Sequence, residues 1–503
     1  MSARACLIVL CVLGSSASAA DWYVAAGGSG DGTSQASPLG SIQGALDVAA
    51  AGDVVHVAAG MYAQPIQTVR AATADRPITV RGETGAVVSV AGRVLTISHP
   101  YHVFEQLVLD AQYADQDAVR IETAGTGAVL RDCEVKRAQR DCIDMGSPAG
   151  VLIERCVIHN CLNATGGRTD AHGIVGAAVH DLTVRDTKIH SFSGDAMQFD
   201  PDRMIPAWDN ITVEGCTLWL EPLPAPENGF PAGTVAGENA IDTKVPAGSM
   251  SHLTVRNTTA YGFRGGLITN MAAFNLKEGV VADLDRVTIY NSEIALRLRA
   301  PATVRVANAV IYDVDSGVRY EGDIVSPQLL SSTFGDKVTN AFVEASSGAT
   351  VIDGRNVLVL GASLPAELAA DKGSLAVDAS SFRDPSMHDF HLVPGSPAID
   401  HGITVDVATD RDGVSRPQGA AHDTGAFEYC ATECAGAPDG AGDPNGSTPG
   451  GCCQTERSEP PWWLLALLLL RRRGRPASRP RPRSHPSSSR DPRRARSARS
   501  GES

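Results

Sequence analysis

Residues Val129–Val135 read VLRDCEV and residues Leu152–Ile158 read LIERCVI, so a short pattern returns after 23 residues. The pattern is apolar, any, apolar, two polar residues, then Cys, Thr or a small residue, any residue and a last apolar residue. Seven further copies stand at Leu182–Ile189, Ile211–Leu218, Leu253–Ala260, Leu284–Ile289, Val304–Ile311, Leu329–Phe334 and Val351–Leu358. Steps between copies run from 22 to 42 residues, which indicates a repeat architecture. The shortest step predicts one coil of a three-sided parallel β-solenoid, and the longer steps predict coils with loop insertions.

The physical basis of this pattern is the β-strand. Alternate side chains of a strand point to opposite faces, so each coil turns one set into a narrow interior and the other set to solvent. One coil cannot bury its inner residues alone, and its neighbours must stack on it. Asn, Asp and Gly suit the tight corners. Leucine-rich repeats are excluded because their Leu-x-x-Leu-x-Leu spacing is absent, and propeller blades need a longer, regular period.

Both ends of the solenoid carry distinctive segments. Tyr23–Tyr62 contains an amphipathic stretch at Ser41–Ala50 that predicts a capping helix, and a first strand at Val54–Val57. The other end contains GSPAIDHG at Gly395–Gly402 and DTGAFEY at Asp423–Tyr429. These segments resemble the opening and closing coils of right-handed parallel β-helix proteins of the pectin-lyase-like group. The resemblance implies an all-β, right-handed parallel β-helix with a short N-terminal capping helix. Lyases, hydrolases, epimerases and adhesins share this fold, so it does not define an activity.

The resemblance covers residues 21–430, which we expect to form one domain. Residues 1–20 combine Arg4, an apolar run and Ala17-Ser18-Ala19, and this order predicts a secretory signal peptide. Residues 431–459 are rich in Gly, Pro, Asp, Ser and Thr without periodicity, which predicts a flexible linker.

The C-terminal end has a composite pattern. A Cys pair near residue 451 precedes residues 460–473, where a short apolar run is followed by an Arg cluster. This order resembles the MYXO-CTERM sorting segment of myxobacterial surface proteins. It implies a secreted protein displayed at the cell surface, held in the cell envelope and associated with the outer membrane. Residues 474–503, rich in Arg, Pro and Ser, are predicted to be a disordered basic tail.

The charge of the folded part limits its partners. Residues 21–470 carry 30 Lys and Arg against 55 Asp and Glu, a net charge of −25. Such a body is a poor general binder of nucleic acid, and none is expected as a partner of the folded domain. An acidic polymer would need a local basic surface or a bound cation. Aromatic residues make up only 5% of the chain, offering few stacking platforms for neutral sugars, and this favours an acidic polysaccharide. We expect a monomer.

The cysteines left after export suit an oxidising compartment. Cys133 and Cys156 hold the same repeat position one coil apart, where a disulfide and a stack of free thiols are both open. Cys142 with Cys161, and Cys430 with Cys434, are further candidate pairs.

A second strand follows most copies of the pattern. We place these strands at 143–145, 174–176, 197–200, 241–244, 267–270, 296–299 and 318–321. With their apolar residues facing inward, the outward column reads Asp144, Val175, Gln198 with Asp200, Asp242 with Lys244, Ile268 with Asn270, Arg297 with Arg299, and Arg319 with Glu321. We expect Gln198, Asn270, Arg299 and Arg319 to bind substrate, because long inserts at Pro201–Asn210 and Glu221–Ala240 flank this column.

Carboxylates crowd two successive coils of the column, at Asp195, Asp200, Asp202, Glu238 and Asp242. Outward charges are usually only solvated. Carboxylates this close would nevertheless repel one another, and an oxygen-only set suits calcium, so the cluster is a candidate calcium site. His172, within Asp170–Gly173, is interpreted as a turn residue.

A second resemblance concerns chemistry. Glu238–Lys244 reads ENAIDTK, similar to a segment of chondroitinase-B-like lyases in which acidic residues bind calcium and the final Lys is the base. The resemblance implies Lys244 as the base, and Glu238 and Asp242 as calcium ligands. Phe274–Gly279 is similar to a later segment in which those enzymes carry an Arg, and Lys277 holds that position here. Arg264, Arg297 and Arg299 are alternative cations for the leaving oxygen or the substrate carboxylates.

Three functions remain open from the sequence. The first is calcium-assisted β-elimination of a uronate-containing polysaccharide. The second is a surface protein that binds or adheres to a glycan without cutting it. The third is a glycoside hydrolase using paired carboxylates, which ranks lowest because the Asn-Thr-Asp, Asp-Asp and Gly-His-Gly signatures of β-helix hydrolases are absent.

Overall fold

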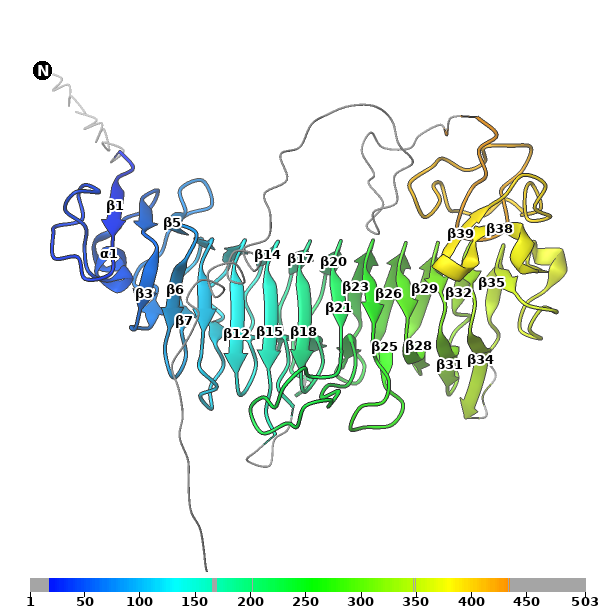
Figure 1. The fold of residues 1–503 in the computed structure, drawn as a ribbon, viewed down its shortest axis with the longest axis horizontal. Coiled ribbons are helices and arrows are strands. Elements are labelled where there is room, and N and C mark those ends of the chain that lie inside the picture. The colour runs from blue at the N-terminus through cyan, green and yellow to red at the C-terminus, as the bar shows by residue number, and fades with distance from the viewer. Residues whose placement is uncertain are drawn as a thin grey trace, which may run out of the picture. The chain divides into compact units, whose positions relative to one another are not determined.

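The computed structural model describes residues 18–164, 170–200, 202–346, 348, 350–432 and 434. These residues form a parallel β-solenoid of about 12 turns, in which three long sheets run side by side along the coil axis (Figure 1). Each coil contributes one strand to each sheet in turn, so the strand order within a sheet advances mostly in steps of three. The predicted all-β parallel β-helix is confirmed.

The bounds of the strands follow the three sheets. Sheet A contains β1 (Asp21–Val24), β2 (Val54–Val57), β5 (Ile78–Gly82), β8 (His102–Glu105), β11 (Val129–Arg131), β14 (Leu152–Glu154), β17 (Thr183–Arg185), β20 (Ile211–Glu214), β23 (Ser251–Arg256), β26 (Val280–Asp285), β29 (Thr303–Ala307), β32 (Gln328–Leu330) and β35 (Asp353–Arg355). Sheet B contains β3 (Gly60–Tyr62), β6 (Ala86–Ser89), β9 (Val108–Asp110), β12 (Glu134–Ala138), β15 (Val157–Cys161), β18 (Lys188–Phe192), β21 (Thr217–Trp219), β24 (Thr259–Tyr261), β27 (Thr288–Tyr290), β30 (Val310–Ile311), β33 (Thr333–Phe334), β36 (Leu358–Leu360) and β37 (Leu375–Val377). Sheet C contains β4 (Ile66–Gln67), β7 (Leu95–Ile97), β10 (Val119–Ile121), β13 (Ile143–Met145), β16 (Ile174–Gly176), β19 (Met197–Phe199), β22 (Ile241–Thr243), β25 (Ala272–Leu276), β28 (Ser292–Arg299), β31 (Val314–Glu321) and β34 (Val338–Ser346).

The repeated pattern of the sequence is a strand, a sharp corner and a second strand. VLRDCEV supplies β11 of sheet A and the start of β12 of sheet B, and Asp132 makes the corner between them. Asp132, Arg155, Asp186 and Asn257 take φ values between 47° and 52° at equivalent corners. This left-handed conformation is one that Asp and Asn adopt more readily than most residues, which explains the polar pair inside the pattern.

The residue after each corner points into the interior. Cys133, Cys156, Thr187, Cys216 and Thr258 are all at most 2% exposed. Cys133 and Cys156 are free thiols within the described residues, so the stack of thiols is the alternative that the structure supports. Cys142 pairs with Cys161, and Cys430 pairs with Cys434, as predicted.

The two ends of the solenoid are closed by different elements. Helix α1 (Ile42–Val48) caps the first coil, and Ser41 is its N-cap, with Oγ accepting from the Gly44 N–H at 3.1 Å. The strand β1, which sequence analysis missed, pairs in register with β2 ahead of the predicted first strand. At the other end β38 (Phe382–Asp384) and β39 (Asp389–Leu392) form a hairpin among three short 3₁₀ helices, Ala370–Lys372, Ala379–Ser381 and Pro385–Met387. Phe390, Phe427 and Tyr312 belong to one buried apolar cluster there, in which Phe390 contacts Tyr312.

One predicted strand is wrong. Residues 267–270 form a loop, in which Leu267 is 64% exposed, and the strand of that coil is β25. Its Phe274 and Asn275 pair with Ile241 and Asp242. The insert between β24 and β25 moves the strand further along the chain. The apolar pair Leu267-Ile268 matches the repeat pattern but does not lie in the core.

The predicted signal peptide lies almost wholly outside the described residues. The linker beyond its first residues, the C-terminal sorting segment and the basic tail also lie outside them. Export and surface display therefore stay predictions. Across the described ranges, no helix is long and apolar enough to cross a membrane.

Candidate functional site

The outer face of sheet C carries a column of polar side chains in strict register. Gln198 of β19 pairs with Asp242 of β22, which pairs with Asn275 of β25. Asn275 pairs with Arg297 of β28, and Arg297 pairs with Arg319 of β31. The predicted column is thus correct except at one coil, where Asn275 takes the place given to Ile268. Stacked parallel strands lie about 4.8 Å apart, so these side chains form one continuous surface.

Four residues converge at the centre of this column and are called the lysine cluster: Asp242, Lys244, Asn275 and Lys277. The Lys277 ammonium lies 2.7 Å from Asp242 Oδ1 and 3.1 Å from Oδ2. Asn275 donates to Oδ1 at 2.8 Å, whereas Lys244 Nζ stays 3.7 Å from Oδ2. The Asp242 and Lys277 side chains are 5% and 11% exposed, against 21% for Lys244. Lys277 is therefore committed to Asp242, and Lys244 is the less engaged and more accessible amine.

The orientation of the Asn275 side-chain amide leaves its oxygen available to a ligand. Its Nδ2 must face Asp242, because the flipped amide would set Oδ1 against a carboxylate oxygen. Oδ1 is buried and has no hydrogen-bond partner among the described residues. A buried acceptor without a donor is unfavourable by about 1–3 kcal/mol, so this oxygen is suited to accept from a ligand hydroxyl or from water.

Two carboxyl groups beside the lysine cluster hold protons unusually well. Burial, followed by the charges of Asp195, Asp170 and Asp242, raises the pKa of Glu238 to about 7. Burial and the charge of Asp242 raise the pKa of Asp195 to about 6. Of these two groups Glu238 is the one with partial access to solvent, since Asp195 is fully buried. Near neutral pH, Glu238 can therefore act as a proton donor.

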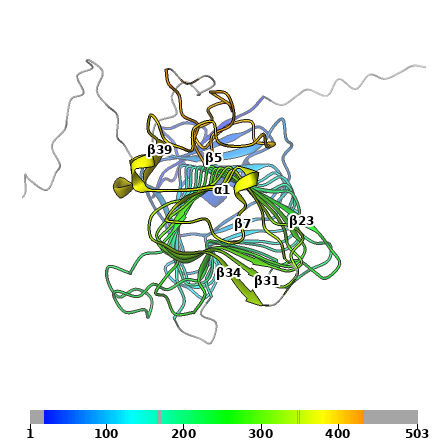
Figure 2. The same ribbon diagram turned by 90° about the vertical axis from the view of Figure 1, so that its right-hand side faces the viewer.

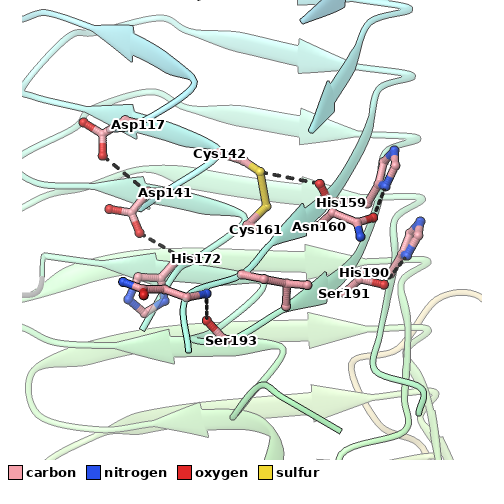
Figure 3. The surroundings of a disulfide bond; sticks show 12 residues. Asp117, Asp141, Cys142, His159, Asn160, Cys161, His172, His190, Ser191 and Ser193 are labelled. Carbon is pink, nitrogen blue, oxygen red and sulfur yellow. Dashed lines mark hydrogen bonds between the residues drawn. A yellow bond between two sulfur atoms is a disulfide. The ribbon is translucent and has the colours of Figure 1, made fainter. Parts of the chain in front are cut away.

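Asp195 belongs to a ladder of polar residues that lies just before the strands of sheet C. The Asp141 carboxylate accepts from the His172 backbone N–H at 2.9 Å (Figure 3). His172 Nδ1 in turn accepts from the Asp195 N–H at 2.7 Å. Asp195 in turn accepts from the Asn239 N–H and Nδ2, and from Gln198 Nε2. Gly194 is required here, because a Cβ at this position would lie 2.3 Å from His172 Nδ1. The ladder ties successive coils together. His172, which the sequence predicts as a turn residue, lies in the connecting segment just before β16, where the structure assigns no turn.

The disulfide between Cys142 and Cys161 lies next to this ladder (Figure 3). It links the residue before β13 of sheet C to the end of β15 of sheet B. The cross-link fixes the coil on the N-terminal side of the site.

Basic residues continue the surface on the C-terminal side and are called the arginine cluster: Arg297, Arg299 and Arg319 around Glu321. Arg297 and Arg319 contact Glu321 Oε1 at 2.8 and 3.0 Å, and Arg299 contacts Oε2 at 3.2 Å. Three guanidinium groups share one carboxylate, so the cluster retains positive charge. Asn270, although it lies in a loop, joins this surface because its Oδ1 accepts from Arg319 Nη1 at 2.8 Å.

Loops project from both edges of sheet C, seen along the axis (Figure 2). Inserts follow β19, β21 and β24 of the same coils that carry the lysine cluster. Trp208 of the first insert is fully buried and donates from Nε1 to the Lys244 carbonyl at 2.8 Å. This contact holds the backbone that carries Lys244.

Other predicted site residues serve the loops. Asp200 Oδ1 accepts from the Met204 N–H at 2.8 Å, and Asp202 is exposed. Arg264 donates to the carbonyls of Ser292 and Asp313, both at 2.9 Å, and so braces a corner.

The predicted calcium ligands do not form a cation cage. Among the residues that the structure describes, no group of three or more His, Cys, Asp and Glu side chains could hold a metal ion. Asp242 and Asp195, the two strand-side candidates, already accept from ammonium and amide groups. The donor set in this arrangement does not fit a calcium ion, and calcium binding stays a prediction.

Aromatic and histidine rings form one continuous stack on the outer face of sheet B. His159, His190, Trp219, Tyr261, Tyr290 and Tyr312 stack on one another, with ring centroids 4.3 to 5.8 Å apart and planes within 17° of parallel. Because each ring covers the face of its neighbour, the faces that would stack on a sugar are already used. The site is therefore assigned to sheet C.

A search of solved structures finds similar folds. A pectate lyase, 16% identical, matches 81% of this chain and 96% of its own with a TM-score of 0.43. A rhamnogalacturonan lyase, 12% identical, matches 73% and 91% with a TM-score of 0.46. A mannuronic-acid-specific polysaccharide lyase from human gut microbiota, 14% identical, matches 62% and 74% with a TM-score of 0.41. No protein-family model and no curated protein sequence matches the chain. The activity has to be argued from the chain's own residues.

Proposed function

We propose that the protein binds an acidic polysaccharide along the outer face of sheet C and cuts it by β-elimination. The observation that carries the proposal is the adjacency of the lysine cluster and the arginine cluster on one surface. Asn275 and Arg297, one from each cluster, are partners in neighbouring strands. On a body with a net charge of −25, five cations gathered on four neighbouring coils are suited to a polymer that carries repeated carboxylates.

The arrangement gives the two lysines different roles. Lys277 is held by Asp242 and supplies positive charge to the substrate carboxylate. Lys244, beyond hydrogen-bonding distance of Asp242, takes the proton from the carbon next to that carboxylate. The arginine cluster binds the carboxylates of neighbouring units, and Asn275 Oδ1 accepts from a sugar hydroxyl.

The proton balance assigns a role to Glu238. When Lys244 accepts the proton, the electron pair of the broken C–H bond forms a carbon–carbon double bond. The bond between the adjacent carbon and the glycosidic oxygen then breaks. Glu238, protonated near neutral pH, gives its proton to the leaving oxygen. The products are a new reducing end and an unsaturated uronate.

Binding without cleavage is the second candidate. Asp242 partly neutralises both lysines, and a surface of this charge can hold a polymer without any proton transfer. In that case Lys244 and Lys277 would only fix carboxylates.

The test is incubation with a panel of uronate polysaccharides, with and without a chelator. Ultraviolet absorbance of the unsaturated uronate reports β-elimination, and a glycan array reports binding. Absorbance that rises equally in both conditions supports the proposed route through side chains. Binding to the array with no absorbance change on any polymer would leave the binding function and remove the lyase. Loss of turnover with chelator would instead restore the calcium prediction.

A further inference from the structure

A pocket of about 610 Å³ lies at the corner between sheets C and A, next to the lysine cluster. Its walls come from four successive coils: Arg203 after β19, Val245–Met250 after β22, Glu278–Gly279 after β25, and Pro301 after β28. Carbon predominates in the lining, which includes Val245, Pro246, Met250 and Val281. The volume is in the range of sites that hold small ligands.

The charged wall of this pocket is an ion pair. Arg203 contacts Glu278 through two nitrogens, with Nη2 to Oε1 at 2.6 Å and Nε to Oε2 at 3.2 Å. Glu278 Oε2 also accepts from the Val245 N–H at 2.5 Å, which joins the loop after β19 to the corners after β22 and β25. The pair is therefore satisfied internally and leaves the carbon lining to meet a ligand.

The pocket adjoins the lysine cluster, because the two share backbone segments and their charges interact. Val245 directly follows Lys244, and Glu278 directly follows Lys277. The hydrogen bond to Glu278 raises the pKa of Arg203, and the charge of Asp242 adds to that effect. A polymer unit held by the lysine cluster would thus reach the pocket with a group on its next unit or its own ring.

We infer that this pocket binds an O-acetylated sugar unit, whose acetyl methyl packs on Val245, Met250 and Val281. This inference rests on the proposed function and adds a preference among acidic polysaccharides. An unsubstituted uronate presents only hydroxyl and carboxylate groups. The carbon lining would remove water from these groups without offering hydrogen bonds in its place. Burying one methyl group contributes about 0.8 kcal/mol, which predicts about fourfold tighter binding of the acetylated polymer.

The experiment compares alginate and polygalacturonate, each with and without chemically added O-acetyl groups, by isothermal titration with the full-length protein. Met250→Gln replaces the exposed wall by a polar chain of similar size. Met250 is 68% exposed, so this change leaves the core intact. The matched control is Met387→Gln, since Met387 is 74% exposed on a short helix near the C-terminal hairpin. Val281→Thr is a second variant at the pocket.

The expected result is tighter binding of at least one acetylated polymer, with the preference lost in Met250→Gln and Val281→Thr and kept in Met387→Gln. Equal or weaker binding of the acetylated forms would overturn the inference while leaving the proposed function in place. A preference that survives both pocket variants would also overturn it. Absence of binding to all four polymers would instead count against the proposed function itself.

Discussion

Sheets A and C carry charged side chains at equivalent outward positions, but the charges are arranged differently. On sheet A, Arg81, Glu105, Arg131, Glu154 and Arg185 occupy five successive strands with alternating sign. Each acid contacts the bases of both neighbouring strands; Glu154, for example, contacts Arg131 at 2.7 Å and also pairs with Arg185. The charges cancel strand by strand.

On sheet C the charges carried by the coils of β19 to β31 do not alternate in this way. Two lysines and an amide converge on Asp242, and three arginines converge on Glu321. Glu238 forms no ion pair with the cations of the part of the chain that the structure describes. The pKa values of Glu154 and Glu238 shift in opposite directions. Hydrogen bonds from Arg131 and Arg185 lower the pKa of Glu154, whereas burial raises that of Glu238. Alternation indicates a face that stabilises the fold, and the convergence of cations on sheet C favours the ligand face that we propose.

The largest expected difference between the two faces is in turnover. Lys244→Ala should lower activity by about 10²–10⁴-fold, because a positioned base contributes that much to a proton transfer. Its melting temperature should stay close to that of the wild type, since Lys244 is not part of the core. Lys188→Ala, on the exposed surface of sheet B, is the matched control and should keep full activity. An active Lys244→Ala protein would move the base to Lys277 or Arg297.

The second prediction concerns the pH dependence of turnover. With a pKa of about 7, Glu238 loses its proton as the pH rises past neutrality, so activity should fall on the alkaline side. Glu238→Gln keeps the shape and removes the transferable proton; it should lower turnover and abolish this alkaline decline. An unchanged profile in the variant would assign the decline, and the proton donor, to another group.

The free energy of unfolding should respond most to substitutions on sheet A. Glu154→Ala leaves Arg131 and Arg185 without their shared carboxylate, and the Glu154 side chain is only 4% exposed. We expect a loss of about 1–3 kcal/mol in the free energy of unfolding, measured by urea denaturation, with turnover unchanged. A loss of activity in this variant would contradict the division between the faces.

The smallest expected effect is a difference in how the two faces titrate. Glu238 and Asp195 have raised pKa values of about 7 and 6, so the folded state binds their protons more tightly than the unfolded state does. Their contribution is complete below the unfolded values of 4.5 and 3.8 and is lost as the pH rises toward 7. Glu154 has a lowered pKa, and its contribution is present above 4.5 and lost in stronger acid.

Melting temperatures across pH should therefore peak in mild acid. The decline from the peak toward pH 7 should shrink in Glu238→Gln, whereas the decline in strong acid should persist. A stability curve that rises from mild acid to neutrality would contradict the raised values on sheet C.

Much of the fold could be predicted because the solenoid repeats local information. The capping helix at Ser41–Ala50, the first strand at Val54–Val57 and most strands of sheet C follow from period-two patterns within ten residues. Prediction failed at the coil with an insert, where Leu267-Ile268 matched the pattern better than the true strand β25. Counting residues from a corner cannot locate a strand when a loop of unknown length intervenes.

Most members of the candidate site could be named from the sequence, but their contacts could not. Lys244, Lys277 and Asp242 were all named, yet the 2.7 Å contact between Lys277 and Asp242 joins residues 35 apart, one coil later. Asn275 was missed because the wrong strand stood in its place. The sequence predicts Asp195 as a metal ligand and does not reveal its hydrogen bond from Asn239, because that bond joins residues 44 apart and depends on coil stacking.

The most direct test of the central claim is the yield of unsaturated uronate from the polysaccharide panel, followed by ultraviolet absorbance for the wild type and Lys244→Ala side by side. The account predicts absorbance that rises with the wild type on at least one acidic polymer and stays flat with Lys244→Ala, while both proteins bind that polymer and melt at the same temperature. Equal product from the two proteins, or none from the wild type on any acidic polymer, would contradict it.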